Sequence, residues 1–400
     1  MIPLFMTGMF RSGTTTMARA LNAHPGIAFA SDPFNEVFKA LRSEEAARIS
    51  QPTPVMAPLG DYYFDPDGQA LLKNLLWQTT LDVPFTVWTR DQLLERLRPR
   101  CETYSGSVAP FLNELAGNSY REMLESLLGS IREAYAGPET TVVGFKEVWT
   151  TEFVPAIART WPEAKFITVE RDPRAVCASK NVRAERYPWT FMARQWRKLA
   201  ALDYLIGVLP ELEGRVLRIR YEDFVVAPEE VTRRICTFLG IPWDPAMADP
   251  SAYRDGAGAP WYQNTAYGDG GGGFDVRALE RWRSVLAGRE TQLIELMCGS
   301  EMALHGYEPE MAQWREPEGD LLLNAPRIRD DQQADWMKGV VPNDHVSTAV
   351  KVAQERIRFE LLSRSEEERD SVSEDLVNAS FLDRKVMEGV CREAGWNPGT

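Results

Sequence analysis

Short apolar runs and helical patterns alternate along most of this chain. Runs typical of buried strands lie at residues 4–6, 27–30, 141–145, 166–169 and 215–220. Apolar residues recur at helical spacing between them, for example at Met17, Ala20 and Leu21. Strands that alternate with helices predict an α/β fold, in which helices flank a parallel β-sheet.

The first apolar run leads directly into a glycine turn and the start of a helix. Gly8 and Gly13 enclose four residues, which is the spacing of a phosphate-binding loop (P-loop). The amide hydrogens of such a turn point inward, and the helix N-terminus adds about half a positive charge. The sequence therefore predicts a P-loop-type anion site at this position.

The positive charge of this loop has an unusual source. Thr14 stands where a nucleotide hydrolase carries lysine, and Arg11 inside the loop can replace that lysine. Ser12, Thr15 and Thr16 offer hydroxyl groups. Because the lysine that would reach a γ-phosphate is missing, the donor is expected to carry something other than a triphosphate. The alternative is an ordinary glycine turn of an α/β protein.

Two carboxylates follow the second predicted strand. Asp32 and Glu36 lie just past its end, at the sheet edge where open parallel sheets bind ligands. A carboxylate there can act as general base on a hydroxyl group. Asp32 can instead cap the next helix, with Pro33 at the first helical position. The sequence leaves both alternatives open for Asp32, and a solvent-facing position open for Glu36.

Strand signals fade over residues 43–138, which we interpret as a largely helical insertion that shapes an acceptor pocket. Aromatic side chains that can line this pocket, or simply pack in the core, are Tyr62, Tyr63, Phe64, Trp77 and Trp88.

Lys146 ends the third predicted strand. A lysine at that point is costly to bury without an anion, so it is expected to face a ligand at the sheet edge or to pair with a carboxylate. Glu147 would point to the opposite face if the strand continued, which makes it the weaker candidate.

The fourth predicted strand ends in a second phosphate-binding candidate. Arg171 lies at its end, Asp172 can cap the next helix, and Pro173 suits the first helical position. Ser179 follows Asp172 by two helical turns, so it is expected on the same helical face. Together with the glycine loop, Arg171 and Ser179 predict a ligand with two separated phosphates.

The last predicted strand leads to Tyr221, which can stack on a purine or pack in the core. A glycine-rich loop at residues 268–273 precedes a predicted helix that can close a basic lid over the ligand. The side chains of this lid are Arg277, Arg281, Trp282 and Arg283.

The C-terminal part turns polar and helical. One helix is expected over residues 346–361 and a second over residues 376–390. We predict one domain over residues 1–312 and a helical extension over residues 313–400. The extension is expected to pack on the domain or on a second copy of the chain.

Composition limits the partners. The 45 basic and 58 acidic residues give a net charge of −13, which argues against nucleic acid and anionic membranes. Five scattered cysteines and three histidines suggest neither disulfides nor a metal site. The first predicted strand starts close to Met1, and long apolar segments are lacking. A cytoplasmic protein without a metal cofactor is expected.

With these residues in view, the chain resembles sulfotransferases that use 3′-phosphoadenosine 5′-phosphosulfate (PAPS). FRSGTTTMARAL is similar to the family's 5′-phosphosulfate loop, which implies binding by Arg11 and the residues after it, Ser12, Gly13, Thr14, Thr15 and Thr16. RDPRAVCAS is similar to the 3′-phosphate motif and places Arg171 and Ser179 on that phosphate. RYEDF matches the signature whose tyrosine, here Tyr221, lies near the adenine. GRETQLIELMCGSEMALHGYEP resembles the family's closing helix.

The resemblance has gaps. Many members carry a histidine after the third strand, whereas FKEVW has Lys146 at the family lysine and no histidine. Branches with a carboxylate base have glutamate after the second strand, where this chain has Asp32. The base can therefore be Asp32 or Glu36. Nothing in residues 313–400 matches.

The function that these motifs imply is sulfuryl transfer from PAPS to a hydroxyl group of a small molecule. Lys146 and Arg11 would stabilise the charge that develops during transfer. Arg277 and Arg283 would cover the donor. The alternatives are a P-loop nucleotide or small-molecule kinase and a non-catalytic nucleotide-binding protein. Carbohydrate and peptide acceptors also remain open.

Overall fold

The computed structural model describes residues 1–49, 66–114, 117–179, 189–261, 274–310 and 345–394. The chain divides into two compact units. The sheet unit comprises Met1–Pro58, Leu71–Arg171 and Leu209–Ala278. The helical unit comprises Leu59–Ala70, Asp172–Val208 and Leu279–Thr400.

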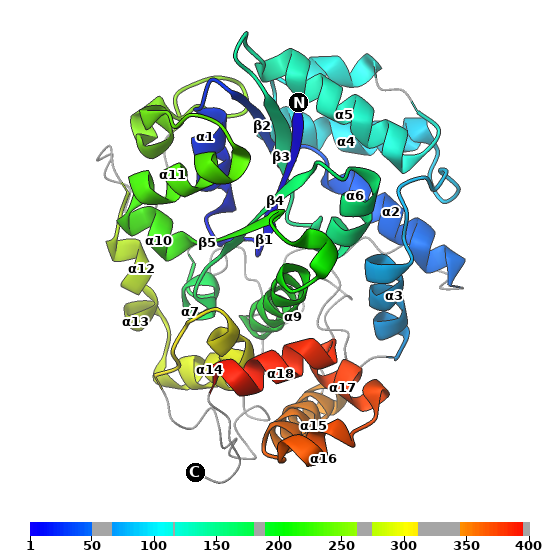
Figure 1. Cartoon of the computed structure of the whole chain (residues 1–400), viewed down its shortest axis with the longest axis vertical. Helices are drawn as coiled ribbons and strands as arrows, with labels where there is room; N and C mark the ends of the chain where they lie inside the picture. Colours follow the sequence, from blue (N-terminus) through cyan, green and yellow to red (C-terminus); the bar gives the residue numbers. More distant parts are fainter. Residues whose placement is uncertain (50–65, 115–116, 180–188, 262–273, 311–344, 395–400) are drawn as a thin grey trace. The chain divides into compact units, whose positions relative to one another are not determined.

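A five-stranded parallel sheet forms the centre of the sheet unit (Figure 1). Its order is β2-β3-β1-β4-β5, which confirms the predicted α/β class. The strands are β1 (Ile2–Gly8), β2 (Ile27–Ser31), β3 (Val142–Lys146), β4 (Lys165–Glu170) and β5 (Val216–Arg220). Met6 and Ser31 both lie opposite Lys146 in the register. Because all the strands are parallel, the residues that follow them meet at one sheet edge.

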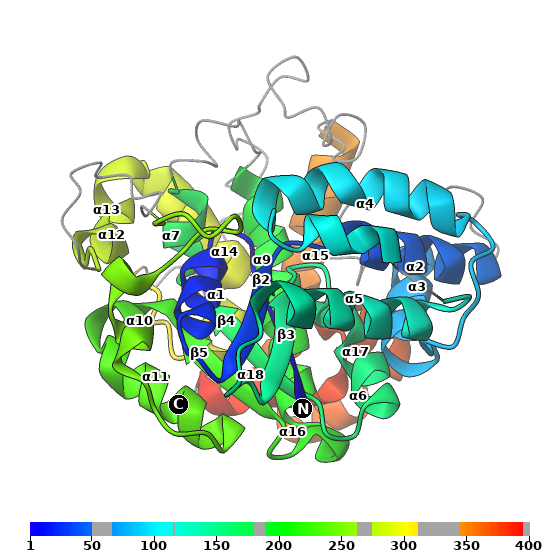
Figure 2. The ribbon, with the colours of Figure 1, turned by 90° about the horizontal axis from the view of Figure 1, so that it is seen from above.

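The two faces of the sheet are buried by different side chains. Helices α1 (Thr14–Asn22) and α11 (Pro228–Leu239) cover the face that carries Leu4 and Met6 (Figure 2). On the other face, Phe5 packs edge-on against Phe145 at 5.3 Å between ring centroids. Burying one such side chain contributes about 1.5–3 kcal/mol. The alternation along β1 thus positions this strand between two apolar layers.

Further helices of the sheet unit lie both inside and outside the stretch without strand signals, residues 43–138. They are α2 (Asn35–Arg48), α4 (Arg90–Tyr104), α5 (Tyr120–Tyr135) and α6 (Val154–Thr160), together with the short α10 (Tyr221–Val226). Helix α3 (Pro66–Trp77) begins in the other unit. Thr89 and Gln92 form a capping box at the start of α4. The described part of the predicted insertion is therefore largely helical.

Of the aromatic side chains expected in the acceptor pocket, Tyr62, Tyr63 and Phe64 lie outside the described residues. Trp77 is exposed. Trp88 is half-buried and lies under the Arg96 guanidinium, 4.8 Å from its carbon to the ring centroid. A pocket-lining role for these residues stays a prediction.

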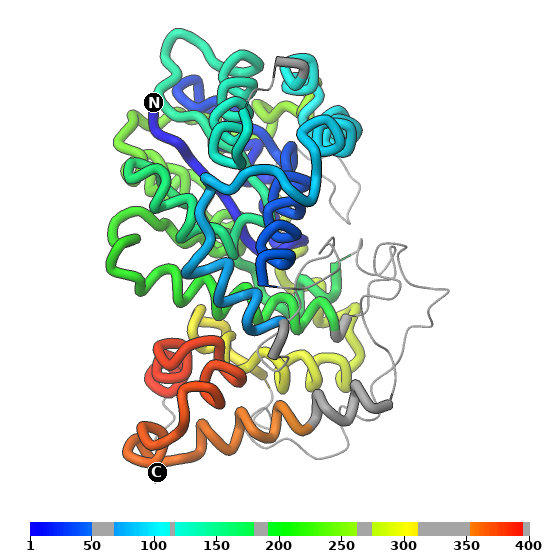
Figure 3. Tube along the Cα trace, turned by 90° about the vertical axis from the view of Figure 1, so that its right-hand side faces the viewer, coloured from blue at the N-terminus to red at the C-terminus, as the bar shows by residue number. Residues whose placement is uncertain are grey.

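The helical unit combines mid-chain and C-terminal helices. They are α7 (Pro173–Cys177), α9 (Trp189–Gly207), α13 (Trp282–Val285), α14 (Gly288–Leu304), α15 (His345–Leu362), α16 (Glu366–Asp370), α17 (Glu374–Phe381) and α18 (Arg384–Glu393). Figure 3 follows the C-terminal part from α15 in orange to α18 in red. Helix α14 packs against α9 and α18. The predicted helical C-terminal extension is confirmed, whereas a domain boundary at residue 312 stays a prediction.

Buried ion pairs hold the C-terminal helices of this unit. Arg358 of α15 lies 2.5 Å from Glu301 of α14 and donates to the carbonyl oxygen of Ser380 in α17 at 2.6 Å. Glu355, one turn earlier on α15, pairs with Arg197 of α9. Helix α15 is thereby tied to α9, α14 and α17.

Two predicted helices are each broken in two. The expected helix at 376–390 stops at Phe381, because Leu382 has a left-handed φ of 72°. Asp383 then caps α18 by accepting from the Lys385 amide at 2.9 Å. The predicted lid helix is also wrong as a single helix, since α12 (Arg277–Glu280) ends before α13 begins.

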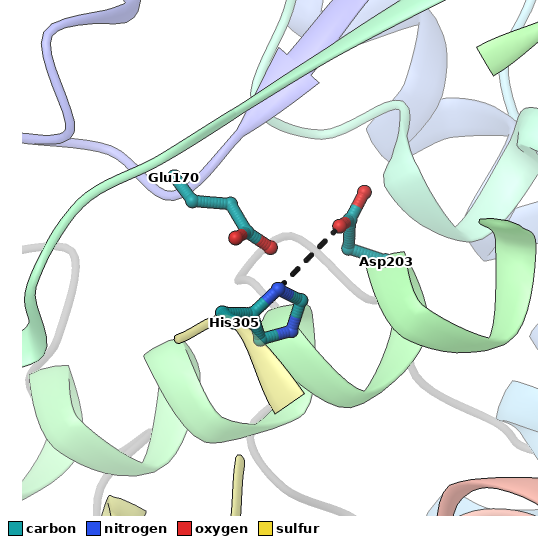
Figure 4. Close-up of side chains that lie close together, drawn as sticks. All are labelled: Glu170, Asp203 and His305. Atoms are coloured by element: carbon teal, nitrogen blue, oxygen red, sulfur yellow. Dashed lines mark ion pairs between the residues drawn. The ribbon is translucent and has the colours of Figure 1, made fainter. Parts of the chain in front are cut away.

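His305 follows α14 as a buried side chain. Its Nε2 lies 2.9 Å from the Ala200 carbonyl oxygen, and its Nδ1 lies 3.9 Å from Asp203 (Figure 4). Glu170, also drawn there, belongs to the sheet unit.

Over the described ranges, every helix is either too short or too polar to cross a lipid bilayer.

Candidate active site

The glycine loop joins β1 to α1 in the way that the sequence predicts. Gly13 is the N-cap residue of α1 with a φ of 80°, and its carbonyl oxygen accepts from the Met17 amide at 3.1 Å. Arg11 also has a left-handed φ, 71°. Such a conformation costs a non-glycine residue about 1–3 kcal/mol and is typical of functional sites. The loop therefore has a strained arginine two residues before the N-cap residue of α1.

Ser12 has a hydrogen-bonded amide and a buried hydroxyl group. Its amide donates to the Met9 carbonyl oxygen at 3.1 Å and is therefore already hydrogen-bonded within the loop. Its Oγ is fully buried and has no hydrogen-bond partner among the described residues. A buried hydroxyl group without a partner is costly, and an anion in the loop would satisfy it.

The residues after β4 and β5 meet this loop. Arg171 donates to the Arg11 carbonyl oxygen at 3.2 Å and to the Ala278 carbonyl oxygen at 3.1 Å. Its guanidinium carbon lies 4.7 Å from the ring centroid of Tyr221. A Cβ on Gly13 would lie 2.1 Å from that ring, so the loop and Tyr221 are in close contact. The structure thus brings together Arg11, Gly13, Arg171 and Tyr221.

Asp32 and Lys146 form a buried ion pair at the ends of β2 and β3. Asp32 is 9% exposed, Lys146 is 2% exposed, and the Lys146 amine contacts Asp32 Oδ2. Asp32 has a φ of 53°, and α2 starts only at Asn35 with Phe34 as its N-cap residue. The alternative that Asp32 caps this helix is therefore wrong. Its carboxylate instead pairs with the lysine on the neighbouring strand.

Glu36, the other candidate base, has different partners. Its Oε1 lies 2.7 Å from the Lys39 amine, and its Oε2 lies 3.1 Å from Arg96 Nε. Both cations come from helices outside the strand ends. Within the sheet unit, Asp32 is consequently the carboxylate that pairs with the predicted catalytic lysine.

Glu147, the weaker candidate from the sequence, follows Lys146 directly and is close enough to Asp32 to feel its charge. Its side chain is fully buried, and its Oε1 accepts from the Phe34 amide at 2.7 Å. Burial, and after it the charge of Asp32, raise the pKa of the Glu147 carboxyl group to about 8. The sequence signal that marks it is a carboxylate directly after Lys146 at a strand end.

Two residues that the sequence predicts to bind PAPS, Ser179 and Arg283, belong to the helical unit. Helix α7 ends at Cys177, so the expected continuous helix to Ser179 is wrong, and the Ser179 amide donates to the Val176 carbonyl oxygen at 3.2 Å. Asp172 caps α7 as predicted, and Pro173 is its first residue. Arg283 pairs with Glu280 and Glu310. Binding of the donor by Ser179 and Arg283 stays a prediction.

Arg277 belongs to the sheet unit, one residue before the end of the segment Leu209–Ala278. Its Nε lies 2.8 Å from Asp275, and its side chain is 68% exposed.

Of the remaining residues of the glycine loop, Thr14 and Thr16 are buried and Thr15 is half-buried. Burial raises the pKa of Tyr221, so its phenol stays protonated at neutral pH.

A comparison with protein-family models gives a match over most of the sheet-forming part of the chain. The model described as "Sulfotransferase family" matches residues 3–245. This range contains the glycine loop, the Asp32–Lys146 pair, Arg171 and Tyr221.

Individual relatives are distant. Carbohydrate sulfotransferase 3 of Homo sapiens is 27% identical over 179 residues, which cover 36% of this chain and 34% of that protein. Carbohydrate sulfotransferase 4 of Mus musculus is 27% identical over 183 residues, 38% of this chain and 44% of that protein. The matches thus span about a third to a half of these relatives. The sulfotransferase domain of the Synechococcus PCC 7002 olefin synthase is 18% identical, with a TM-score of 0.44, and covers 77% of this chain and 94% of that domain.

Proposed function

This chain belongs to the sulfotransferase family, and we propose that it transfers a sulfuryl group from PAPS to a hydroxyl group of a small-molecule acceptor. In this reaction the acceptor oxygen forms a bond to sulfur, and the bond from sulfur to the donor phosphate breaks. The hydroxyl proton passes to a carboxylate, and 3′-phosphoadenosine 5′-phosphate leaves. The family match favours this reaction over a kinase reaction.

The glycine loop is the proposed site of the 5′-phosphosulfate. Arg11 supplies positive charge, and the first turn of α1 supplies amides that no intrahelical carbonyl can pair with. The buried Ser12 hydroxyl group fits an anion at this point, because an oxyanion would satisfy it. Arg171 and Ser179 are the proposed contacts of the 3′-phosphate, and Tyr221 is the proposed neighbour of the adenine.

The ion pair of Asp32 and Lys146 is the observation that carries this proposal. It places a carboxylate and an ammonium group together at the sheet edge, where Lys146 ends β3 beside the loop strand β1 and Asp32 follows β2 on the far side of β3. Asp32 takes the proton of the acceptor hydroxyl group, and Lys146 stabilises negative charge on the oxygens between donor and acceptor. The reaction as proposed uses no metal ion.

The acceptor class and the cellular location are also proposals. The curated relatives include carbohydrate sulfotransferases and a putative protein-tyrosine sulfotransferase of Caenorhabditis elegans, which keeps a sugar hydroxyl group and a tyrosine side chain among the candidate acceptors. All five cysteines are free and buried, as expected in a reducing cytoplasm.

Replacement of Lys146 by methionine tests the proposal. Lys146→Met should lower kcat for PAPS-dependent transfer by about 10²- to 10³-fold, because a preorganised cation is lost. The measurement is the mass gain of one sulfuryl group on a panel of alcohols, phenols and sugars.

Lys165→Met is the matched control, since Lys165 starts β4 at the opposite sheet edge and donates to the Phe238 carbonyl oxygen. Its kcat should stay within about threefold of wild type. Equal losses in both variants would contradict the assignment of Lys146.

Calorimetric titration with 3′-phosphoadenosine 5′-phosphate distinguishes a sulfotransferase from a non-catalytic binding protein and from a kinase. A binding protein would bind the nucleotide but transfer no sulfuryl group, and a kinase would prefer ATP with magnesium.

A further inference from the structure

Glu147 is a buried carboxyl group that the proposed reaction does not use. It follows Lys146 directly, is 0% exposed, and lies in the sheet unit together with Asp32. Its Oε1 accepts a hydrogen bond, whereas its Oε2 is buried and has no such partner among the described residues. A carboxyl group in this position is costly, so its role calls for an explanation.

Two consecutive residues at the end of β3 hold the turn that carries Asp32. The Asp32 amide donates to the Lys146 carbonyl oxygen at 2.8 Å. Two residues later, the Phe34 amide donates to Glu147 Oε1 at 2.7 Å. Two hydrogen bonds therefore hold the turn: the Asp32 amide bonds to a backbone oxygen, and the Phe34 amide bonds to the Glu147 side chain.

This turn needs to be held because Asp32 has a left-handed backbone conformation, with a φ of 53°. A non-glycine residue keeps such a conformation only where its surroundings determine it. The same conformation directs the Asp32 carboxylate to Lys146. Without the acceptor for the Phe34 amide, the turn is free to relax, and the carboxylate is no longer held beside the lysine.

The charges around Glu147 come from three elements. Asp32 follows β2, Lys146 ends β3, and Arg100 and Cys101 lie on α4. Burial is the largest influence on the Glu147 carboxyl group, and it raises the pKa to about 8. Glu147 is consequently protonated at neutral pH and does not compete with Asp32 for the Lys146 ammonium group.

We propose that Glu147 is a positioning residue of the transfer reaction, which holds the turn at Asp32 so that the proposed base stays beside Lys146. This role rests on the proposed function for its effect on turnover. The holding of the turn itself is a property of the structure and can be measured without any substrate.

The test compares leucine and glutamine at position 147. Glu147→Leu fills a similar volume but cannot accept from the Phe34 amide, whereas the amide oxygen of Glu147→Gln can. In Glu147→Leu, kcat should fall by about 100-fold, the cost of a misplaced catalytic group, with little change in KM for PAPS. Glu147→Gln should keep kcat within about threefold at neutral pH.

The pH profile provides a second readout. Above a pH of about 8 the wild-type carboxyl group ionises and competes for Lys146, so kcat should fall there. Glu147→Gln cannot ionise, and its profile should lack this fall.

Glu44→Leu is the matched control for the loss of a buried carboxylate. Glu44 is 4% exposed and accepts from the Thr86 and Val87 amides at 2.7 and 2.8 Å. Rates are compared per folded molecule. An equal loss of kcat in Glu44→Leu and Glu147→Leu would show a merely structural role and overturn the proposal.

Hydrogen exchange of the Asp32 and Phe34 amides separates this inference from the proposed function. Exchange should be faster in Glu147→Leu and unchanged in Glu147→Gln. Unchanged exchange in the leucine variant overturns the inference, whatever the activity. Faster exchange in a protein whose wild type transfers no sulfuryl group would leave the positioning intact and reject the proposed function.

Discussion

At the scale of single residues, the partners of a side chain determine its role more than its position in the chain. Asp32 and Glu36 are only four positions apart in the sequence, yet Asp32 pairs with Lys146 whereas Glu36 pairs with Lys39 and Arg96. The sequence left either carboxylate open as the base, with a helix cap as the alternative for Asp32 and a solvent-facing position as the alternative for Glu36. Only Asp32 has the lysine of the neighbouring strand beside it, so we infer that it is the base.

Substitution by the corresponding amides separates the two candidates. Asp32→Asn should lower kcat by about 10²- to 10⁴-fold, because an amide cannot take the acceptor proton. Glu36→Gln should lower kcat by less than about tenfold, since it weakens only the ion pairs of Glu36 with Lys39 and Arg96. Steady-state transfer rates at saturating PAPS measure both. The opposite ranking would make Glu36 the base.

Glu147 should make stability dependent on pH. The unfolded chain loses this proton near the usual value of 4.5, but the folded protein keeps it to about 8. Between these values the folded state binds more protons, so the free energy of unfolding falls as pH rises and levels off above about 8. Glu147→Gln removes this dependence.

We therefore expect the wild-type Tm to fall more between pH values of about 5.5 and 8 than the Tm of Glu147→Gln. Thermal unfolding of both proteins across this range gives the comparison. Parallel curves would mean that Glu147 titrates near its ordinary value when folded.

At the scale of elements, the junction of β1 and α1 depends on a glycine. Gly13 has a left-handed φ of 80°, and a Cβ there would lie 2.1 Å from the Tyr221 ring. Backbone conformation and close contact therefore both exclude a larger residue. The sequence motif required this glycine for the loop, and the contact with Tyr221 adds a second reason.

Gly13→Ala should weaken binding of 3′-phosphoadenosine 5′-phosphate by at least about tenfold and lower the Tm, because the loop and Tyr221 must move apart. Gly129→Ala is its control. Gly129 lies inside α5, and a Cβ at this position would have nothing within 4 Å, so alanine should stabilise the helix by about 1 kcal/mol. Calorimetric titration and thermal unfolding test both variants. Unchanged nucleotide affinity in Gly13→Ala would contradict the placement of the donor in this loop.

At the scale of the whole molecule, the C-terminal helices are part of a compact unit with mid-chain helices. Arg358 and Arg197 are nearly inaccessible to solvent and pair with Glu301 and Glu355. Such pairs contribute specificity more than net stability, but breaking one leaves a buried charge alone. Association of two copies through these helices remains a proposal.

Arg358→Met should therefore lower the free energy of unfolding by about 3–5 kcal/mol. Arg364→Met removes a pair of Arg364, which follows α15, with Glu360 near the end of that helix. Both side chains are more than a third exposed, so the loss should cost at most about 1 kcal/mol. Urea unfolding of the full chain measures both values. A similar small change in both variants would show that α15 contributes little to this unit.

The sequence by itself determined the five strands, their parallel arrangement, the glycine loop and the residues at the strand ends. These features are local: apolar runs, glycine spacing and capping residues act within a few positions of the chain. The family resemblance came from the same short motifs. Where a local signal was overlooked, as with the Asp383 cap, the predicted helix was wrong.

The tertiary structure alone decided which carboxylate meets Lys146, that the Ser12 amide is already bonded, and that Glu147 is buried against the Phe34 amide. Each of these outcomes joins groups from different strands or across a turn. Burial and pairing depend on where distant segments meet, and the free energy of a buried charge depends on those partners. The local sequence does not determine such contacts, because they form only when the sheet brings the ends of different strands together.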